Sequence, residues 1–271
     1  MTQTILITGA TDGIGLEVAR QASESGARTI LVARDAAKLQ AVAASLPGAH
    51  RPQTVTVDLT DPAQISSFLA DLDARGVVPD VVVNNAGHGA SGAFADADWA
   101  KYAAMIQLNV TALAQLTHWA AQRMKAKGRG AIVNLSAAVA TRPTPYFAAY
   151  AASKAFVTSL SIAADKELRP HGVTVSAIHP PAVRTSFADA GKADLRSTLV
   201  LKLFPSVSAA TVARAVLRVA RTGRRSVVVG PIAGIIMATA LVMPRGLDLA
   251  FMSLLFKGRR APAAPAIALG E

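Results

Sequence analysis

Short apolar runs alternate with longer amphipathic stretches along most of the chain. Such alternation is typical of βαβ units, in which helices cover a parallel sheet. The pattern predicts seven strands, at Thr4–Thr8, Thr29–Ala33, Thr54–Val57, Val81–Asn84, Ala131–Ser136, Thr174–Ile178 and Ser226–Val229. It predicts helices at Ile14–Ser25, Asp35–Leu46, Trp99–Lys127, Tyr150–Arg169 and Ser208–Thr222. The expected fold class is therefore α/β, a doubly wound, seven-stranded parallel sheet with helices on both faces.

The length of 271 residues suits one large domain of this kind. We expect a single domain over residues 1–260, of which 230–260 form an apolar and basic C-terminal extension, and a frayed, Ala/Pro-rich tail over 261–271. The uncharged stretch Val227–Met243 has 17 residues, at the low edge for a transmembrane helix, and contains Gly230 and Pro231. The favoured interpretation is a short strand, a turn and an apolar helix that lies on the body or on a membrane surface.

Composition and charge narrow the function classes. The chain has no cysteine, which excludes disulfides and a cysteine nucleophile. The net charge of +11 is uneven, because residues 1–191 hold 16 basic and 14 acidic side chains whereas 192–271 hold 12 and 3. A basic segment rich in Leu, Ile, Val and Met suits an anionic ligand or a membrane surface. Aromatic residues make up only 5%, so nucleic-acid binding is not expected.

The start of the chain bears on its location. A buried strand begins at Thr4 with no basic region before it, so no secretory signal is expected. We expect a cytoplasmic protein, with peripheral membrane contact through the C-terminal region.

A glycine-rich turn, Thr8–Gly15 (TGATDGIG), connects the first predicted strand to the first helix. Glycines there let the backbone approach a diphosphate, and the positive end of the helix faces its charge. The spacing alone is weak, and an ordinary tight βα turn would use the same residues. The position between strand and helix favours a dinucleotide site.

The end of the second strand bears on which dinucleotide binds. An NAD site places an acidic side chain there, and an NADP site a basic one that meets the 2′-phosphate. Here Ala33 takes the expected acidic position and Arg34 follows. We therefore favour NADP(H) over NAD(H), with Asp35 as a helix N-cap.

Tyr150 and Lys154 are candidates for proton transfer, because residues four apart share one face of a helix. A nearby ammonium group would lower the pKa of the phenol enough to make it a usable acid/base. Ser136 ends a strand at the edge where open α/β sheets bind ligands, and could donate a hydrogen bond to a substrate oxygen. His88 and His179 lie near this crevice in sequence, where packing is the favoured role.

Together these residues resemble the short-chain dehydrogenase/reductase family, which has a Rossmann-type fold. The matching motifs are TGATDGIG, Asp58-Leu59, NNAG (residues 84–87), Asn109, Ser136 and YAASK (residues 150–154), in the family's order. By this resemblance Tyr150 is the acid/base, Lys154 holds the nicotinamide ribose, Ser136 holds the substrate oxygen and Asn109 supports a water. The cofactor-binding residues that it implies are Gly9, Thr11, Asp12, Gly13, Ile14, Gly15, Arg34, Asp58, Leu59, Asn85, Ala86, Gly87, Tyr150, Lys154, Pro180, Val183 and Thr185.

One departure from the family pattern follows the sixth strand. The family has Pro-Gly there, whereas this chain has Pro180-Pro181. Pro181 lacks a backbone N–H and restricts the turn beside the nicotinamide pocket.

We therefore expect an NADP(H)-dependent oxidoreductase that interconverts a carbonyl and a primary or secondary alcohol. Apolar residues between Ser186 and Pro205 suit a lid over a lipid-, steroid- or long-chain-like substrate, and equally a core helix. The alternative is a catalytically weak cofactor-binding or membrane-surface regulatory protein on the same fold. The resemblance also implies a homo-oligomer, and no bound metal is expected.

Overall fold

A parallel sheet forms the centre of the computed structural model, which describes residues 2–181, 183 and 206–256. Its seven strands run in the order β3-β2-β1-β4-β5-β6-β7, and every neighbouring pair is parallel. The strands are β1 (Thr4–Thr8), β2 (Arg28–Ala33), β3 (Gln53–Thr56), β4 (Val81–Asn84), β5 (Gly130–Leu135), β6 (Val173–His179) and β7 (Ser226–Val228). The predicted fold class is confirmed, and each strand boundary lies within one residue of its prediction.

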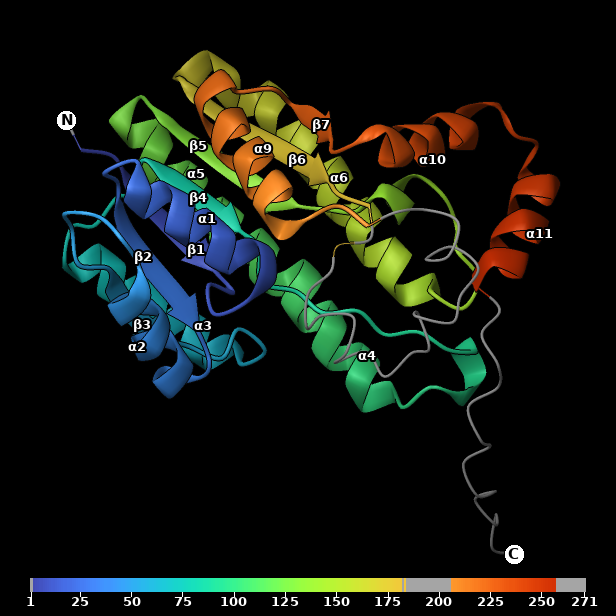
Figure 1. Cartoon of the computed structure of the whole chain (residues 1–271), viewed down its shortest axis with the longest axis horizontal. Helices are drawn as coiled ribbons and strands as arrows, with labels where there is room; N and C mark the ends of the chain where they lie inside the picture. Colours follow the sequence, from blue (N-terminus) through green and yellow to red (C-terminus); the bar gives the residue numbers. More distant parts are fainter. Residues whose placement is uncertain (1, 182, 184–205, 257–271) are drawn as a thin grey trace, which may run out of the picture.

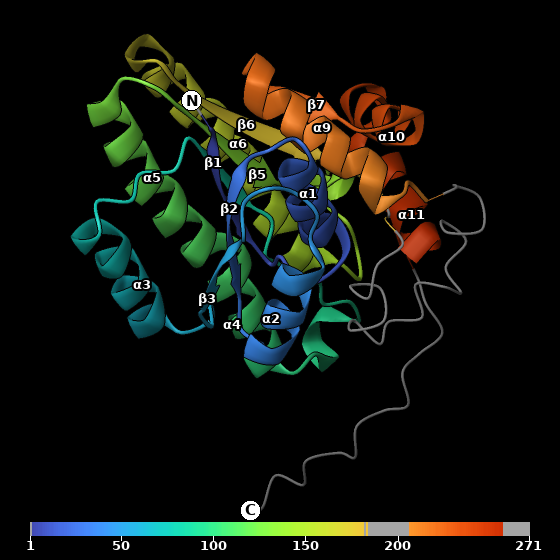
Figure 2. The same ribbon diagram turned by 60° about the vertical axis from the view of Figure 1, so that its left-hand side comes forward.

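Helices cover both faces of the sheet (Figures 1 and 2). One face packs against α1 (Gly13–Glu24), α2 (Ala36–Ser45) and α9 (Ala209–Thr222), and the other against α3 (Pro62–Ala74), α5 (Leu113–Lys127) and α6 (Ala148–Leu168). Each interface is a separate apolar cluster, with Leu31 and Val216 in the first and Leu6 and Leu116 in the second. Burying one such Leu fully is worth about 2 kcal/mol, so the two clusters hold the layers together.

The helix predicted over Trp99–Lys127 is interrupted. It consists of α4 (Trp99–Ile106), a π-helical segment, η2 (Gln107–Ala112), and α5. The helix α3 was not predicted, although Asp61 and Pro62 are a typical start, with the Asp61 carboxylate accepting from Ala63 N at 2.8 Å.

Two further helices follow β7, α10 (Pro231–Val242) and α11 (Arg245–Phe256). They lie beyond the β7 edge of the sheet, at one end of the molecule (Figure 1). Over the described residues, no helix has both the length and the apolar composition that a membrane crossing requires. The segment 186–205 and the tail 261–271 lie outside the described residues.

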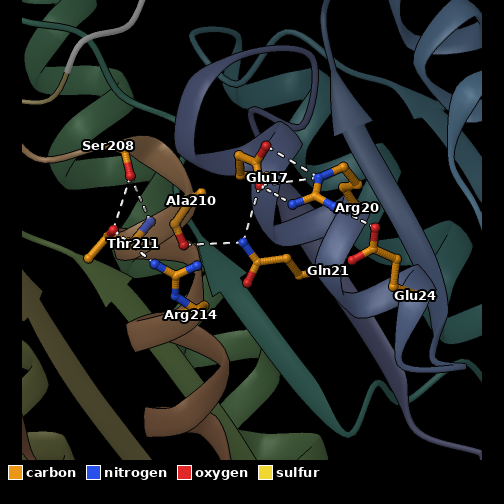
Figure 3. Close-up of polar contacts among 8 residues, drawn as sticks. All are labelled: Glu17, Arg20, Gln21, Glu24, Ser208, Ala210, Thr211 and Arg214. Atoms are coloured by element: carbon orange, nitrogen blue, oxygen red, sulfur yellow. Dashed lines mark hydrogen bonds and ion pairs between the residues drawn. The ribbon is translucent and has the colours of Figure 1, made fainter.

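Helices α1 and α9 are tied by polar contacts as well as by apolar packing (Figure 3). Gln21 Nε2 of α1 donates to the carbonyl oxygen of Ala210, in the first turn of α9, at 3.1 Å, and also to Glu17 Oε2 at 3.1 Å. The Ser208 hydroxyl caps α9 by accepting from Thr211 N at 3.2 Å. The start of α9 is thereby fixed beside the helix that follows the glycine-rich turn.

Candidate active site

The strand order reverses between β1 and β4, and ligands of open α/β sheets bind at the carboxyl ends of strands at such a point. There the Thr8 hydroxyl oxygen accepts from the backbone N–H groups of Asn85 and Ala86, both at 3.0 Å. Asn85 Nδ2 donates to the carbonyl oxygens of Thr8, at 3.0 Å, and Gly9, at 3.1 Å. The glycine-rich turn is therefore held against the end of β4, as the predicted site requires.

Two glycines of the turn are needed for its own packing. Gly9 has a φ of +66°, and a Cβ on Gly15 would lie 2.1 Å from the Gly9 carbonyl oxygen. Asp12 is the N-cap of α1, and its carboxylate accepts from Gly13 N at 2.6 Å. The first turn of α1 carries no acidic side chain, which leaves the positive end of the helix available to an anion.

The residues predicted around the adenosine half differ in how they are placed. Arg34 is exposed directly after β2, and Asp35 caps α2, as expected. Asp58 is half-buried, and its carboxylate accepts from the Thr60 N–H at 2.9 Å and hydroxyl at 2.7 Å. The Leu59 side chain packs in the second core cluster, so this residue presents only backbone to a ligand.

Tyr150 and Lys154 share one face of α6, with Lys154 Nζ 5.9 Å from the centroid of the tyrosine ring. Lys154 is buried, and its Nζ donates to the Leu135 carbonyl oxygen, at the end of β5, at 2.8 Å. Burial lowers the pKa of Lys154 to about 8 and raises the pKa of Tyr150. The pKa of Tyr150 therefore lies above its ordinary value, and the expected net lowering is wrong, because desolvation is the largest cause of the shift.

Asn109 connects the loop after β4 to α6. Its Oδ1 accepts from His88 N at 3.1 Å, and its Nδ2 donates to the His88 carbonyl oxygen at 2.9 Å and to the Ser153 hydroxyl at 3.2 Å. A Cβ on Gly87 would lie 2.9 Å from Asn109 Oδ1 and 3.5 Å from Lys154 Nζ. The structure thus brings NNAG, Asn109 and the YAASK helix together.

Ser136 directly follows β5, at the strand end where it was expected. Its side chain is buried, and its Oγ donates to the Lys154 carbonyl oxygen at 2.9 Å and lies 2.8 Å from Thr158 Oγ1. The hydroxyl is therefore engaged in the interface between β5 and α6. This geometry ties β5 to α6, and the expected hydrogen bond from Ser136 to a substrate oxygen stays a prediction.

The residues after β6 are described only in part. The Pro180 carbonyl oxygen accepts from Ala138 N at 3.0 Å, and Val183 forms a parallel bridge to Val207. Thr185 lies outside the described residues. His179 is fully buried, with Nε2 3.0 Å from Ser226 Oγ, which is the packing role expected for it.

The charges of two cations act on His88, in the loop after β4. Burial is the main cause that lowers the pKa of His88, and the charges of Arg34 and Lys154 lower this pKa further. A hydrogen bond with the Lys101 backbone acts in the opposite direction and raises it. The guanidinium group of Arg34, after β2, and the ammonium group of Lys154, in α6, therefore both act on the His88 imidazole. Such a site suits an anionic ligand.

A model of the short chain dehydrogenases matches residues 3–195. The chain belongs to the short-chain dehydrogenase/reductase family. It is thus an oxidoreductase acting on CH–OH or carbonyl groups, in a family that binds a nicotinamide cofactor.

Two relatives show how far the sequence similarity of this dehydrogenase/reductase extends. A protein named granaticin polyketide synthase putative ketoacyl reductase 1, from Streptomyces violaceoruber, is 37% identical over 187 residues, which are 68% of this chain and 69% of that protein. A very-long-chain 3-oxoacyl-CoA reductase from Laccaria bicolor is 34% identical over 176 residues, 63% of this chain. The match spans 52% of that reductase, about half its length.

A solved structure covers nearly the whole chain. It is the short-chain dehydrogenase from Sphingobium yanoikuyae in complex with NADPH, which superposes with a TM-score of 0.75 at 32% identity. The superposition covers 97% of this chain and 99% of that one. The shared architecture therefore includes the region of α10 and α11 as well as the sheet.

Three features of the dehydrogenase/reductase site were missed from sequence. The π-helical segment that carries Asn109 has no sequence signal, because its residues are compatible with an ordinary helix. Tyr146 has a φ of +64°, which tyrosine rarely adopts, and its carbonyl oxygen accepts from Gly92 N at 2.9 Å. Phe147, just before α6, packs its ring edge-on against Tyr150 with centroids 5.8 Å apart.

Proposed function

We propose that this enzyme is an NADP(H)-dependent reductase that interconverts a carbonyl and a primary or secondary alcohol on an apolar substrate. The observation that carries the proposal is the placement of Tyr150 beside the buried Lys154 at the carboxyl end of β5, next to Gly87 and Asn109. An acid/base and a cation are thereby fixed at the edge of the sheet where the glycine-rich turn also lies.

The residues present fit a phosphorylated dinucleotide. The positive end of α1, whose first turn holds no acidic side chain, suits the diphosphate, and the exposed guanidinium of Arg34 suits a 2′-phosphate. The relative from Sphingobium yanoikuyae, which binds NADPH, supports this choice. When bound, the cofactor supplies a hydride to the carbonyl carbon.

In the reducing direction Tyr150 is the proton donor. Its raised pKa keeps the phenol neutral at neutral pH, so that it can donate its proton to the carbonyl oxygen as that oxygen gains charge. Lys154, with a pKa of about 8, is largely protonated at neutral pH and stabilises the negative charge left on the phenol. Ser136 holds the Lys154 backbone, and Asn109 fixes the loop after β4 against α6.

The relatives support a substrate class, and so do the large apolar residues among 186–205, such as Phe187, Leu201 and Phe204. The relatives named above are ketoacyl and very-long-chain 3-oxoacyl-CoA reductases, whose substrates carry a ketone on an acyl chain. We propose a long-chain or similarly apolar carbonyl compound. The same family membership supports a homo-oligomer in which residues 1–260 form one domain.

Oxidation of NADPH and of NADH with a panel of aliphatic aldehydes and ketones tests the proposal. NADPH is expected to be used at least about tenfold more efficiently than NADH, and Arg34→Ala is expected to remove most of that preference. Tyr150→Phe is expected to abolish turnover while NADPH affinity stays near its wild-type value. A Tyr150→Phe variant that keeps most of its activity would refute the mechanism, and a wild-type protein inactive on every carbonyl would favour the weakly catalytic alternative.

Ser136→Ala separates the two roles considered for Ser136. A positioning role predicts a loss of kcat below about tenfold, whereas loss of a direct hydrogen bond to the developing oxyanion would cost about 100-fold or more. Thr158→Val is the matched control, because it removes the other hydroxyl of the same contact.

A second proposal concerns a membrane surface. Helices α10 and α11 expose a C-terminal apolar face, whose members are Leu241, Val242, Leu247, Phe251 and Leu254, with Leu241 85% and Leu254 67% exposed. Between residues 206 and 256 the only acidic residue is Asp248, which is buried in an ion pair with Arg142. Arg245 is exposed beside this face, and Lys257, Arg259 and Arg260 follow in sequence. An apolar face with basic neighbours suits anionic lipid.

Vesicle flotation tests this contact. The protein is expected to bind phosphatidylcholine vesicles that contain phosphatidylglycerol and to bind pure phosphatidylcholine weakly. Leu247→Glu together with Leu254→Glu is expected to lower the bound fraction about tenfold, whereas Phe94→Glu, at another exposed apolar residue, leaves it unchanged. If the double variant instead dissociates an oligomer in light scattering, the face is an interface between copies.

A further inference from the structure

Arg142 connects the catalytic end of the sheet to the C-terminal helices. It directly follows the 3-10 turn η3 (Ala138–Thr141), between β5 and α6. Its Nη1 donates to Asp248 Oδ1 of α11 at 2.7 Å, and its Nη2 donates to Thr239 Oγ1 of α10 at 2.6 Å. Nη2 also donates to the carbonyl oxygen of Ile236, and Nη1 lies 3.6 Å from Met252 Sδ. One guanidinium group thus holds two helices that follow it by about a hundred residues.

This ion pair is buried, with side-chain exposures of 2% for Arg142 and 7% for Asp248. Among the described residues the Arg142 Nε finds no hydrogen-bond partner. Removing two charges from water is costly, and an apolar pair of similar volume commonly gives equal or greater stability. A net gain in stability therefore does not by itself account for this pair. Its fixed geometry has a more specific consequence, the placement of α10 and α11.

The end of α11 lies two ring contacts from the acid/base. Phe256 packs against Phe147 with ring centroids 5.2 Å apart, and Phe147 packs edge-on against Tyr150 at 5.8 Å. Phe147 is itself buried at the start of α6. A shift of α11 would therefore change the packing around Tyr150.

We propose that Arg142 and Asp248 are positioning residues, which hold α10 and α11 as an apolar wall beside Tyr150 and thereby determine which carbonyl substrates are accepted. The inference rests on the proposed reaction at Tyr150. The wall acts on substrates with long apolar chains, because these extend furthest from the reacting carbonyl. Neither charge takes part in proton transfer, so what matters is the position that the pair imposes.

The test replaces the pair in two ways. Arg142→Met and Asp248→Leu each leave one buried charge or a gap, whereas the double variant replaces the ion pair by an apolar pair. Asp248→Asn is the conservative variant, in case either single variant fails to fold. Arg123→Met is the matched control, because Arg123 pairs with Asp73 in a partly exposed ion pair between α5 and α3.

Kinetics with NADPH and a homologous series of aliphatic 2-ketones supply the first readout. Arg142→Met, Asp248→Leu and Asp248→Asn are each expected to raise KM at least about tenfold for the longest ketones and about threefold or less for the shortest. In the double variant, KM for the longest ketones is expected to return most of the way to its wild-type value. Hydrogen exchange of residues 231–256 is the second readout, with faster exchange in the single variants and near wild-type exchange in the double variant. Arg123→Met is expected to leave both unchanged.

Two results would overturn the inference. One is that Asp248→Asn leaves unchanged both the KM values for the ketone series and the hydrogen exchange of residues 231–256. The other is a double variant as impaired as the single variants, which would mean that the charges act directly. Tyr150→Phe separates this inference from the proposed function. If Tyr150→Phe stays active the reaction itself is wrongly assigned, whereas an inactive Tyr150→Phe beside unaffected pair variants refutes the positioning role alone.

Discussion

At the residue scale, Lys154 combines function with a cost in stability. Its ammonium group is buried at the end of β5, where the Leu135 carbonyl oxygen is its hydrogen-bond acceptor. Burial lowers the pKa of Lys154 from 10.5 to about 8. Between these two pH values the unfolded chain holds a proton that the folded chain has lost, so this group makes stability rise with pH across that window. Below pH 8 the full cost of burying the charge is present.

Lys154→Met is therefore expected to stabilise the fold at neutral pH while abolishing turnover. The gain in unfolding free energy is expected to reach up to about 3 kcal/mol at pH 7 and to shrink towards zero near pH 10.5. Urea denaturation at several pH values measures it. Lys38→Met, at a lysine with 74% side-chain exposure, is the control and is expected to change little. A Lys154→Met variant that is less stable than wild type at every pH would contradict the argument.

The candidate site residues differ in how far sequence could place them. Tyr150, Lys154 and the glycine-rich turn follow from local spacing, because a helix face and a strand-to-helix turn are local geometries. The direction of the Ser136 hydroxyl depends on how α6 packs against β5, which no local pattern contains. The same holds for the pKa of Tyr150, which burial in the folded chain raises.

At the scale of elements, the π-helical segment between α4 and α5 determines how Asn109 is presented. Sequence correctly indicated helix from Trp99 to Lys127, because the apolar periodicity continues through it. One widened turn does not alter that periodicity enough to be seen. Its effect is local but functional, since the segment carries the side chain that joins the NNAG loop to α6.

Asn109→Leu is expected to destabilise the protein by about 2–3 kcal/mol, because it leaves the partly buried N–H and C=O groups of His88 without their partners. NADPH affinity is expected to fall as the loop after β4 loosens. Asn109→Asp keeps the acceptor for the His88 N–H but loses both donated bonds, so an intermediate effect is expected. Urea denaturation and NADPH fluorescence titration measure the series. Equal stability of Asn109→Leu and wild type would show that these hydrogen bonds do not hold the loop.

At the scale of the whole molecule, the sheet was predictable from the sequence, whereas the packing of α10 and α11 against the rest of the protein was not. Seven strands and their parallel order follow from alternating apolar runs and from the preference for right-handed βαβ connections. The contact of α10 and α11 with Arg142 joins segments about a hundred residues apart through one buried ion pair. The sequence indicates an apolar helix after Gly230 but not the surface on which it packs.

The separation between the complete sheet and the two C-terminal helices predicts how a shortened chain behaves. The sheet is complete at β7, so a chain ending at Val229 is expected to fold and to bind NADPH with an affinity within about threefold of wild type. Its Tm is expected to be several degrees lower, because Met252 and Leu255 no longer cover the rest of the protein. Turnover is expected to fall at least about tenfold, because Phe256 no longer packs on Phe147 beside Tyr150. A chain ending at Phe256 is the control and is expected to keep its turnover. Loss of NADPH binding in the shorter chain alone would show instead that α10 and α11 are part of the cofactor-binding fold.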